Sequence, residues 1–143
     1  VHVAVQGTGS VGGGVARLLA KDGAKLTLAD INAERAAGLA RELGGQAVAS
    51  DAIMSTACDV FSPNALGAIL DDEGIARLDC AIVAGGANNQ LARPEHGAAL
   101  AARRRPSGCA TLGPDRFRGV AGHTHQRGDP RAMAERDAVS AHL

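Results

Sequence analysis

Three glycines near the start of the chain have the spacing of a phosphate-binding turn. Gly7, Gly9 and Gly12 follow a predicted strand over 1–6, and a helix is predicted to begin at Val11. In a dinucleotide site the first glycine permits a tight turn, the second lets the backbone approach a pyrophosphate, and the third lets helix and strand pack closely. The helix N-terminus then faces the anion. Such turns also occur without a ligand, so the rest of the chain must decide.

An acidic residue stands where a dinucleotide site needs one. Asp30 lies 18 residues after Gly12, at the carboxyl end of a predicted second strand over 25–30. A carboxylate there can accept hydrogen bonds from an adenosine ribose and repels a 2′-phosphate, which favours NAD over NADP. The alternative is that Asp30 merely ends the strand or caps the helix that begins after Asn32.

Alternating strands and helices must position these residues. The pattern predicts an α/β fold with a Rossmann-like, doubly wound, mostly parallel sheet. The predicted strands cover 1–6, 25–30, 46–49, 59–61 and 81–84, and the predicted helices cover 11–22, 33–43, 65–70 and 94–104. We expect the first helix to end at Asp22, with Gly23 in the left-handed conformation.

Two loops follow strands at the same predicted edge of the sheet. They are Ser62–Asn64 and Gly85–Asn89. Ligands of open α/β sheets bind at the carboxyl edge. Small residues there admit a flat ring, and side-chain amides can bond ribose hydroxyls or a carboxamide. Asn88 and Asn89 are also common turn formers, which is the alternative.

At this point the sequence resembles a known family, the glutamate/leucine/phenylalanine/valine dehydrogenases, and within it the leucine dehydrogenase-like NAD-binding domain. The resemblance covers residues 1–102, and the segments that carry it are Val3–Gly12, Gly23–Asn32, Cys58–Gly67, Ala84–Leu91 and Arg93–Gly97.

This resemblance implies an oligomeric, two-domain enzyme that uses NAD to interconvert a branched-chain or apolar L-amino acid with its 2-oxo acid and ammonia. Matching positions imply that the pyrophosphate lies at Gly7, Thr8, Gly9, Ser10, Val11, Gly12 and Gly13, the adenosine at Asp30 and Asn32, and the nicotinamide half at Pro63, Asn64, Ala65, Ala84, Gly85 and Asn88. Leucine dehydrogenases usually have Cys where this chain has Asn64.

The resemblance assigns no catalytic residue to this chain. The family's catalytic lysine and aspartate and its substrate-binding lysine belong to an N-terminal domain that has no counterpart here. The chain also begins with Val1, inside a predicted strand, and not with Met. We therefore expect a fragment that binds NAD but meets the amino-acid substrate only through a missing domain, and that forms a homo-oligomer in the full-length protein.

The composition changes near Arg103. Residues 1–102 carry 7 Lys/Arg and 11 Asp/Glu, whereas 103–143 carry 8 Arg and 4 Asp/Glu, so the two net charges cancel. We predict a partial NAD-binding Rossmann domain over 1–104 and a loop-rich, poorly ordered, Arg-rich tail over 105–143, with 130–143 as a candidate surface helix. A misread frame or a decayed coding end would explain the tail.

Charge and cysteine content narrow the class of protein. The net charge is zero, so no nucleic-acid or membrane partner is expected, and no signal peptide or membrane-length apolar run is present. Three cysteines without close spacing predict neither a disulfide framework nor a zinc site, and favour a cytoplasmic location. Cys58 and Cys80 are expected to be small buried groups.

Three alternatives stay open. A non-catalytic dinucleotide-sensing module would also carry the strand, glycine turn, helix, strand and Asp30. A truncated product that folds poorly would explain the tail. His123 and His125, with His142 or Cys109, could ligate a metal, but no rigid element is predicted to hold them, so we predict no metal site.

Overall fold

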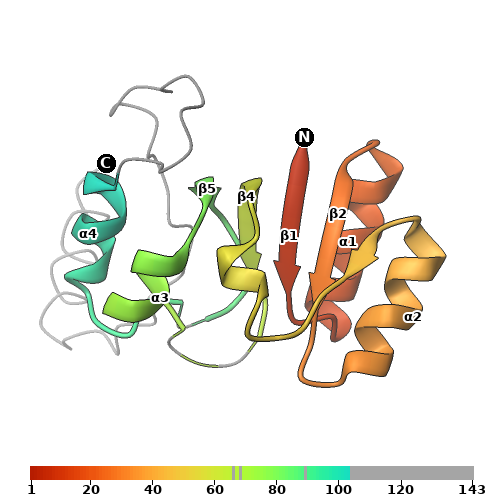
Figure 1. The fold of residues 1–143 in the computed structure, drawn as a ribbon, viewed down its shortest axis with the longest axis horizontal. Helices are drawn as coiled ribbons and strands as arrows, with labels where there is room; N and C mark the ends of the chain where they lie inside the picture. The colour runs from red at the N-terminus through yellow and green to blue at the C-terminus, as the bar shows by residue number, and fades with distance from the viewer. Residues whose placement is uncertain (66, 68, 89, 104–143) are drawn as a thin grey trace, which may run out of the picture.

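Strands and helices alternate along the chain (Figure 1). The computed structural model describes residues 1–65, 67, 69–88 and 90–103. The strands are β1 (His2–Gln6), β2 (Lys25–Ala29), β3 (Gln46–Ala47), β4 (Cys58–Pro63) and β5 (Cys80–Val83). The helices are α1 (Ser10–Lys21), α2 (Ala33–Leu43), α3 (Asp72–Arg77) and α4 (His96–Ala102), and a 3-10 helix, η1 (Ile53–Ser55), precedes β4.

The five strands form one sheet in the order β3-β2-β1-β4-β5. Every neighbouring pair is parallel, which confirms the predicted α/β, Rossmann-like, doubly wound fold. The chain moves outward from β1 to β3 and then returns to β4 on the other side of β1. In open α/β sheets, ligands bind outside the carboxyl ends of the two strands at which the strand order reverses, and here these strands are β1 and β4.

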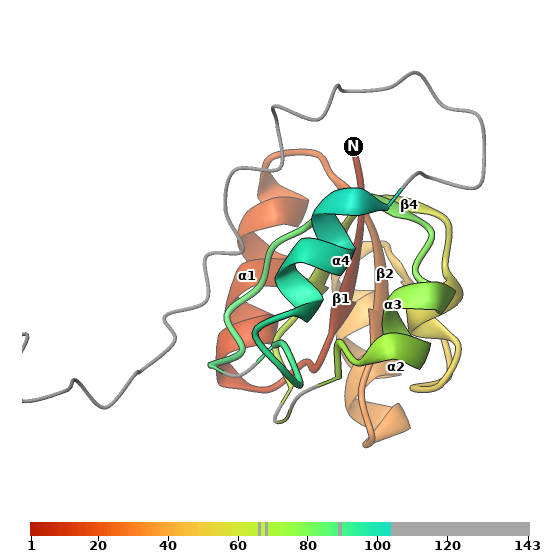
Figure 2. The ribbon, with the colours of Figure 1, turned by 90° about the vertical axis from the view of Figure 1, so that its left-hand side faces the viewer.

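Each face of the sheet is covered by its own helices. Val3 and Val5 alternate with Ala4 along β1, so the two valines point to one face of the sheet and Ala4 points to the other. Val3 and Val5 pack with Ala16 of α1 and Leu39 of α2, whereas Ala4 packs in a cluster that includes residues of η1, α3 and α4. Figure 2 shows α1 and α3 on opposite sides of the strands. The two clusters hold β1 rigidly in the centre of the sheet.

One predicted helix is wrong. Residues 65–70 were expected to be helical, but Leu70 is fully buried and forms a parallel bridge with Leu91. The helix of this region is α3, which begins at Asp72, seven residues after the predicted start, because the Asp71 side chain caps it by accepting a hydrogen bond from the Gly74 N–H at 2.7 Å. A short apolar run fits a buried extended segment as well as a helix.

The other elements match the expected order with different lengths. Helix α2 has the predicted bounds. Helix α1 begins and ends one residue earlier than predicted, with Asp22 as its C-cap, and Gly23 has the expected left-handed conformation at φ 80°. Helix α4 covers only His96–Ala102, and β3 only Gln46–Ala47. The predictions for 105–143, including the candidate helix over 130–143, lie outside the described residues.

Candidate functional site

The turn from β1 into α1 requires glycine at two positions for the protein's own packing. Gly7 has φ 84°, and a Cβ atom there would lie 2.7 Å from the backbone nitrogen of Ala65. A Cβ on Gly12 would overlap the Gly7 carbonyl oxygen and lie 3.0 Å from Cβ of Asn64. Both glycines therefore let α1, β1 and the end of β4 meet closely.

Among the residues that the structure describes, no packing contact requires glycine at position 9. Gly9 lies just before α1 with φ −68° and ψ −161°, a conformation open to any residue, and a Cβ atom there would meet no atom within 4 Å. Helix α1 has no side-chain cap and no acidic residue in its first turn, whereas Asn32 caps α2 and Asp71 caps α3. The helix dipole and the first-turn N–H groups therefore face an open surface that suits an anion.

Asp30 is joined directly to the glycine turn. Its Oδ2 accepts hydrogen bonds from the backbone N–H of Thr8 at 2.7 Å and from the Thr8 hydroxyl at 2.9 Å. Its Oδ1 accepts the N–H of Asn32 at 2.9 Å. Two carboxylate oxygens offer about four acceptor positions, so one position is left for a ligand hydroxyl. Asp30 therefore has a structural role that the sequence did not reveal.

The surroundings of Asp30 favour its ionised form. The residue is buried, which alone would raise its pKa, but the hydrogen bonds donated by Asn32 and Thr8, with the nearby Arg35 charge, hold the pKa of the carboxyl below its ordinary value. Nη1 of Arg35 lies 3.8 Å from Oδ2, and the Arg35 side chain is half-exposed. The carboxylate is thus a fixed negative charge beside the turn.

Asn32 serves mainly as the cap of α2. Its side-chain oxygen accepts the N–H of Arg35 at 3.0 Å, which leaves its amide nitrogen available for a ligand. The residue between Asp30 and Asn32 is Ile31, whose side chain is 94% exposed. Ile31 was not among the predicted site residues, although an apolar residue between two polar ones at a strand end was a signal.

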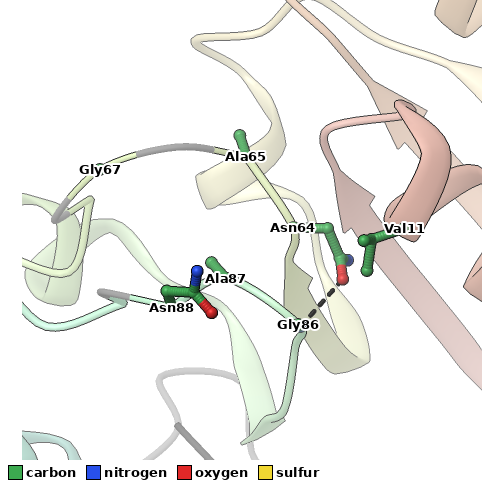
Figure 3. A pocket seen from close by; sticks show the side chains of 7 residues that line it. All are labelled: Val11, Asn64, Ala65, Gly67, Gly86, Ala87 and Asn88. Carbon is green, nitrogen blue, oxygen red and sulfur yellow. Dashed lines mark hydrogen bonds between the residues drawn. The ribbon is translucent and has the colours of Figure 1, made fainter. Parts of the chain in front are cut away.

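A cavity of about 270 Å³ lies at the carboxyl ends of β4 and β5. Figure 3 shows the seven residues that line it, which are Val11, Asn64, Ala65, Gly67, Gly86, Ala87 and Asn88. Val11 belongs to the first turn of α1, so the cavity begins where the glycine turn ends. The two predicted parts of the site are therefore continuous along one edge of the sheet.

The predicted site residues fall into two groups. The first group surrounds the open edge of the sheet and consists of the glycine turn, Asp30, Val11, Asn64, Ala65 and Asn88. Pro63 is buried, and neither Pro63 nor Ala84 nor Gly85 lines the cavity. A Cβ on Gly85 would lie 2.6 Å from the Pro63 nitrogen, so these residues hold the strand ends together.

The described residues hold neither a metal-binding cluster nor a membrane-spanning helix. Among them, no group of three or more His, Cys, Asp or Glu side chains is arranged to hold a metal ion. No helix within the described residues is long and apolar enough to cross a membrane. Cys58 and Cys80 are buried as expected, and the histidines at 123, 125 and 142 lie outside the described part of the chain.

Comparison with known proteins shows clear relatives for the described domain. The chain is 49% identical over 98 residues to leucine dehydrogenase of Thermoactinomyces intermedius, which covers 68% of this chain and 27% of the relative. It is 40% identical over 103 residues to phenylalanine dehydrogenase of the same organism, which covers 71% of this chain and 28% of the relative. The chain thus spans about a quarter of the length of these curated relatives.

A solved structure agrees with the sequence relatives. L-tryptophan dehydrogenase from Nostoc punctiforme superposes with a TM-score of 0.68 at 39% identity, covering 70% of this chain and 31% of that chain. An imine reductase from Pseudomonas sp., at 17% identity and a TM-score of 0.51, shares the fold alone. No family model matches the chain.

Proposed function

We propose that this chain, which carries a domain of the amino-acid dehydrogenase family, binds NAD along the carboxyl edge of its sheet. The observation that carries the proposal is the uncapped N-terminus of α1 beside Gly9, where a glycine that the packing does not require opens onto free space. A pyrophosphate approaching the backbone would need that space, and the helix N-terminus would stabilise its charge.

The rest of the edge supports a dinucleotide of defined orientation. Asp30 would accept a hydrogen bond from the adenosine ribose, with the exposed Ile31 and the amide of Asn32 beside it. The cavity between Asn64 and Asn88 would take the nicotinamide half. Bound there, NAD would supply a hydride acceptor, and this chain's residues would hold it in place.

In the whole protein we propose reversible oxidative deamination of an L-amino acid, with a branched-chain or apolar side chain as the substrate class. The amino-acid site and the acid–base groups would come from a further domain, and the assembly would be a homo-oligomer, as the family resemblance implies. A non-catalytic dinucleotide sensor is disfavoured by identity of 40–49% to leucine and phenylalanine dehydrogenases.

Titration of the full chain with NAD, followed by calorimetry, tests the proposal with two matched glycine variants. A Cβ meets no atom within 4 Å at Gly9 or at Gly14, so neither substitution creates a clash. Gly9→Ala should weaken NAD binding at least about tenfold because it fills the space beside the uncapped helix end. Gly14→Ala, in the interior of α1, should leave the affinity unchanged and stabilise the fold by up to about 1 kcal/mol.

The same titration can defeat the proposal. Equal NAD affinity in the wild type and in Gly9→Ala would rule out pyrophosphate binding at this turn. The absence of any heat of binding with a folded wild-type chain would contradict NAD binding by this chain. Separately, the purified chain mixed with leucine and NAD should form no NADH, and measurable turnover would contradict the proposal that the acid–base groups come from a further domain.

A further inference from the structure

The side chain of Asn64 connects the ends of β4 and β5. Its Nδ2 donates hydrogen bonds to the Ser62 carbonyl and to Oγ of Ser62, both at 3.0 Å, and its Oδ1 accepts the backbone N–H of Gly86 at 2.9 Å. Figure 3 shows this last bond as a link between the two walls of the cavity. Because Gly86 offers a donor, the oxygen of the amide must face it.

Every polar atom of the Asn64 amide therefore already has a partner within the protein. The nitrogen is paired with two acceptors of Ser62 and the oxygen with the N–H of Gly86, so holding these residues is the role that these bonds give to this side chain. Asn64 also lines the cavity, so a change in the residues that it holds would change the shape of the cavity.

The segment that Asn64 holds is tightly placed. The Ala87 N–H donates to the Pro63 carbonyl at 3.1 Å, next to the bond from Gly86 to Asn64, so two successive amides are tied to the end of β4. A Cβ on Gly86 would lie 2.8 Å from Cγ1 of Val11. The Gly86–Asn88 wall therefore lies within contact distance of α1 on one side and of β4 on the other.

We propose that Asn64 is a positioning residue that sets the distance between the two cavity walls and thereby the affinity for the nicotinamide half of the dinucleotide. This inference rests on the proposed function. The Asn64 side chain would fix the position of Gly86 and, through Gly86, the positions of Ala87 and Asn88. The adenosine end, at Asp30, is bonded to a different part of the chain and does not depend on Asn64.

The test compares NAD with ADP-ribose, which lacks the nicotinamide, by calorimetry on the full chain. Asn64→Ala should lower the affinity for NAD about five- to tenfold, as expected for the loss of the hydrogen bonds that hold Gly86 in place. The affinity for ADP-ribose should change less than about twofold. Ser62→Ala removes one partner of the Asn64 nitrogen without touching the cavity lining, and should weaken NAD in the same selective way to a smaller extent. Asn64→Asp keeps the acceptor for Gly86. Its affinity is measured with NADH, whose ring has no positive charge to attract the new carboxylate, and should lie between the NADH affinities of the wild type and of Asn64→Ala.

Amide hydrogen exchange gives a readout that needs no ligand. In Asn64→Ala the Gly86 amide should exchange faster, while the Ala84 amide, which donates to the Phe61 carbonyl at 3.0 Å, should keep its rate and serves as the internal control. Faster exchange at both positions would mean general loosening and would overturn the assignment.

The binding outcomes separate the two proposals. If the wild type binds neither NAD nor ADP-ribose, the proposed function is wrong, and this assignment with it. If the wild type binds both, and Asn64→Ala and Ser62→Ala weaken both equally or neither, the proposed function stands and Asn64 is not a positioning residue.

Discussion

At the scale of single residues, Asp30 shows how one side chain can serve both fold and site. The sequence offered two exclusive roles, ribose acceptor or cap, because a residue's neighbours along the chain do not reveal what it touches in space. In the structure its carboxylate holds Thr8 and Asn32, and the cap of α2 is Asn32 itself. The stabilising partner, Thr8, lies 22 residues away and carries no recognisable signal.

Asp30→Asn should destabilise the fold at neutral pH. The amide cannot accept all the hydrogen bonds that the two carboxylate oxygens accept from Thr8 and Asn32, and the loss should be about 1–3 kcal/mol of unfolding free energy. Because the pKa of Asp30 is lowered in the folded state, its stabilising contribution is present above the unfolded pKa of about 3.9 and is lost as the pH falls through the lower folded pKa.

Urea denaturation of the wild type and of Asp30→Asn at a series of pH values checks this. The difference in unfolding free energy should be constant near neutrality and shrink below about pH 4. A difference that stays constant down to the lowest accessible pH would mean that the carboxylate charge does not stabilise the turn.

The same variant should change the choice of cofactor. With the carboxylate charge removed, the half-exposed Arg35 guanidinium near it becomes available to a 2′-phosphate, so the ratio of NAD to NADP affinity should fall by about tenfold. Competition between NAD and NADP, measured by calorimetry, gives that ratio. Arg35→Ala combined with Asp30→Asn is the control, and it should bind NADP more weakly than Asp30→Asn alone.

At the scale of elements, periodicity located most helices and strands, and packing decided the rest. Helix α2 was predictable because Asn32 begins it and Gly44 ends it in the sequence itself. The segment over 65–70 was not, because its few apolar residues fit either a helix or an extended chain, and only the bridge to Leu91 decides. The hydrogen bond that the Gly86 N–H donates to Asn64 joins loops 22 residues apart, and no sequence pattern predicts it.

Gly85→Ala should destabilise the junction of β4 and β5. Its Cβ would lie 2.6 Å from the nitrogen and 2.7 Å from Cδ of Pro63, atoms of a rigid ring that cannot turn away, so the loss should be about 1–3 kcal/mol. Gly38→Ala in α2 is the matched control, because its Cβ would meet nothing within 4 Å. That control should raise stability by up to about 1 kcal/mol in thermal denaturation. Equal melting temperatures for the two variants would contradict the close approach.

At the scale of the whole molecule, the order of strands makes the site and the overall stability depend on each other. The strand order reverses between β1 and β4, so this point divides the sheet into a half formed by β1, β2 and β3 and a half formed by β4 and β5. A bound dinucleotide would contact both halves. The alternating pattern alone predicted this architecture. The amino-acid side of the proposed reaction was beyond prediction because the chain spans about a quarter of its relatives' length.

NAD should therefore stabilise the full chain against heat. A ligand at 100 times its Kd that binds only the folded state adds about 2.7 kcal/mol to the unfolding free energy. Differential scanning fluorimetry should show a melting temperature that rises with NAD concentration and does not respond to free nicotinamide at the same concentrations. A flat trace with and without NAD would favour instead the reading of a poorly folding product.

Gly9 also bears on how the sequence would change during evolution. The packing of this structure requires glycine at positions 7 and 12 whether or not a ligand is bound, but no contact among the described residues requires glycine at position 9. In a lineage that lost the dinucleotide, drift would therefore reach position 9 first and leave its two neighbours intact. The residue at that position would then record whether selection on the ligand persisted, which makes Gly9 a better marker of retained binding than the glycine motif as a whole.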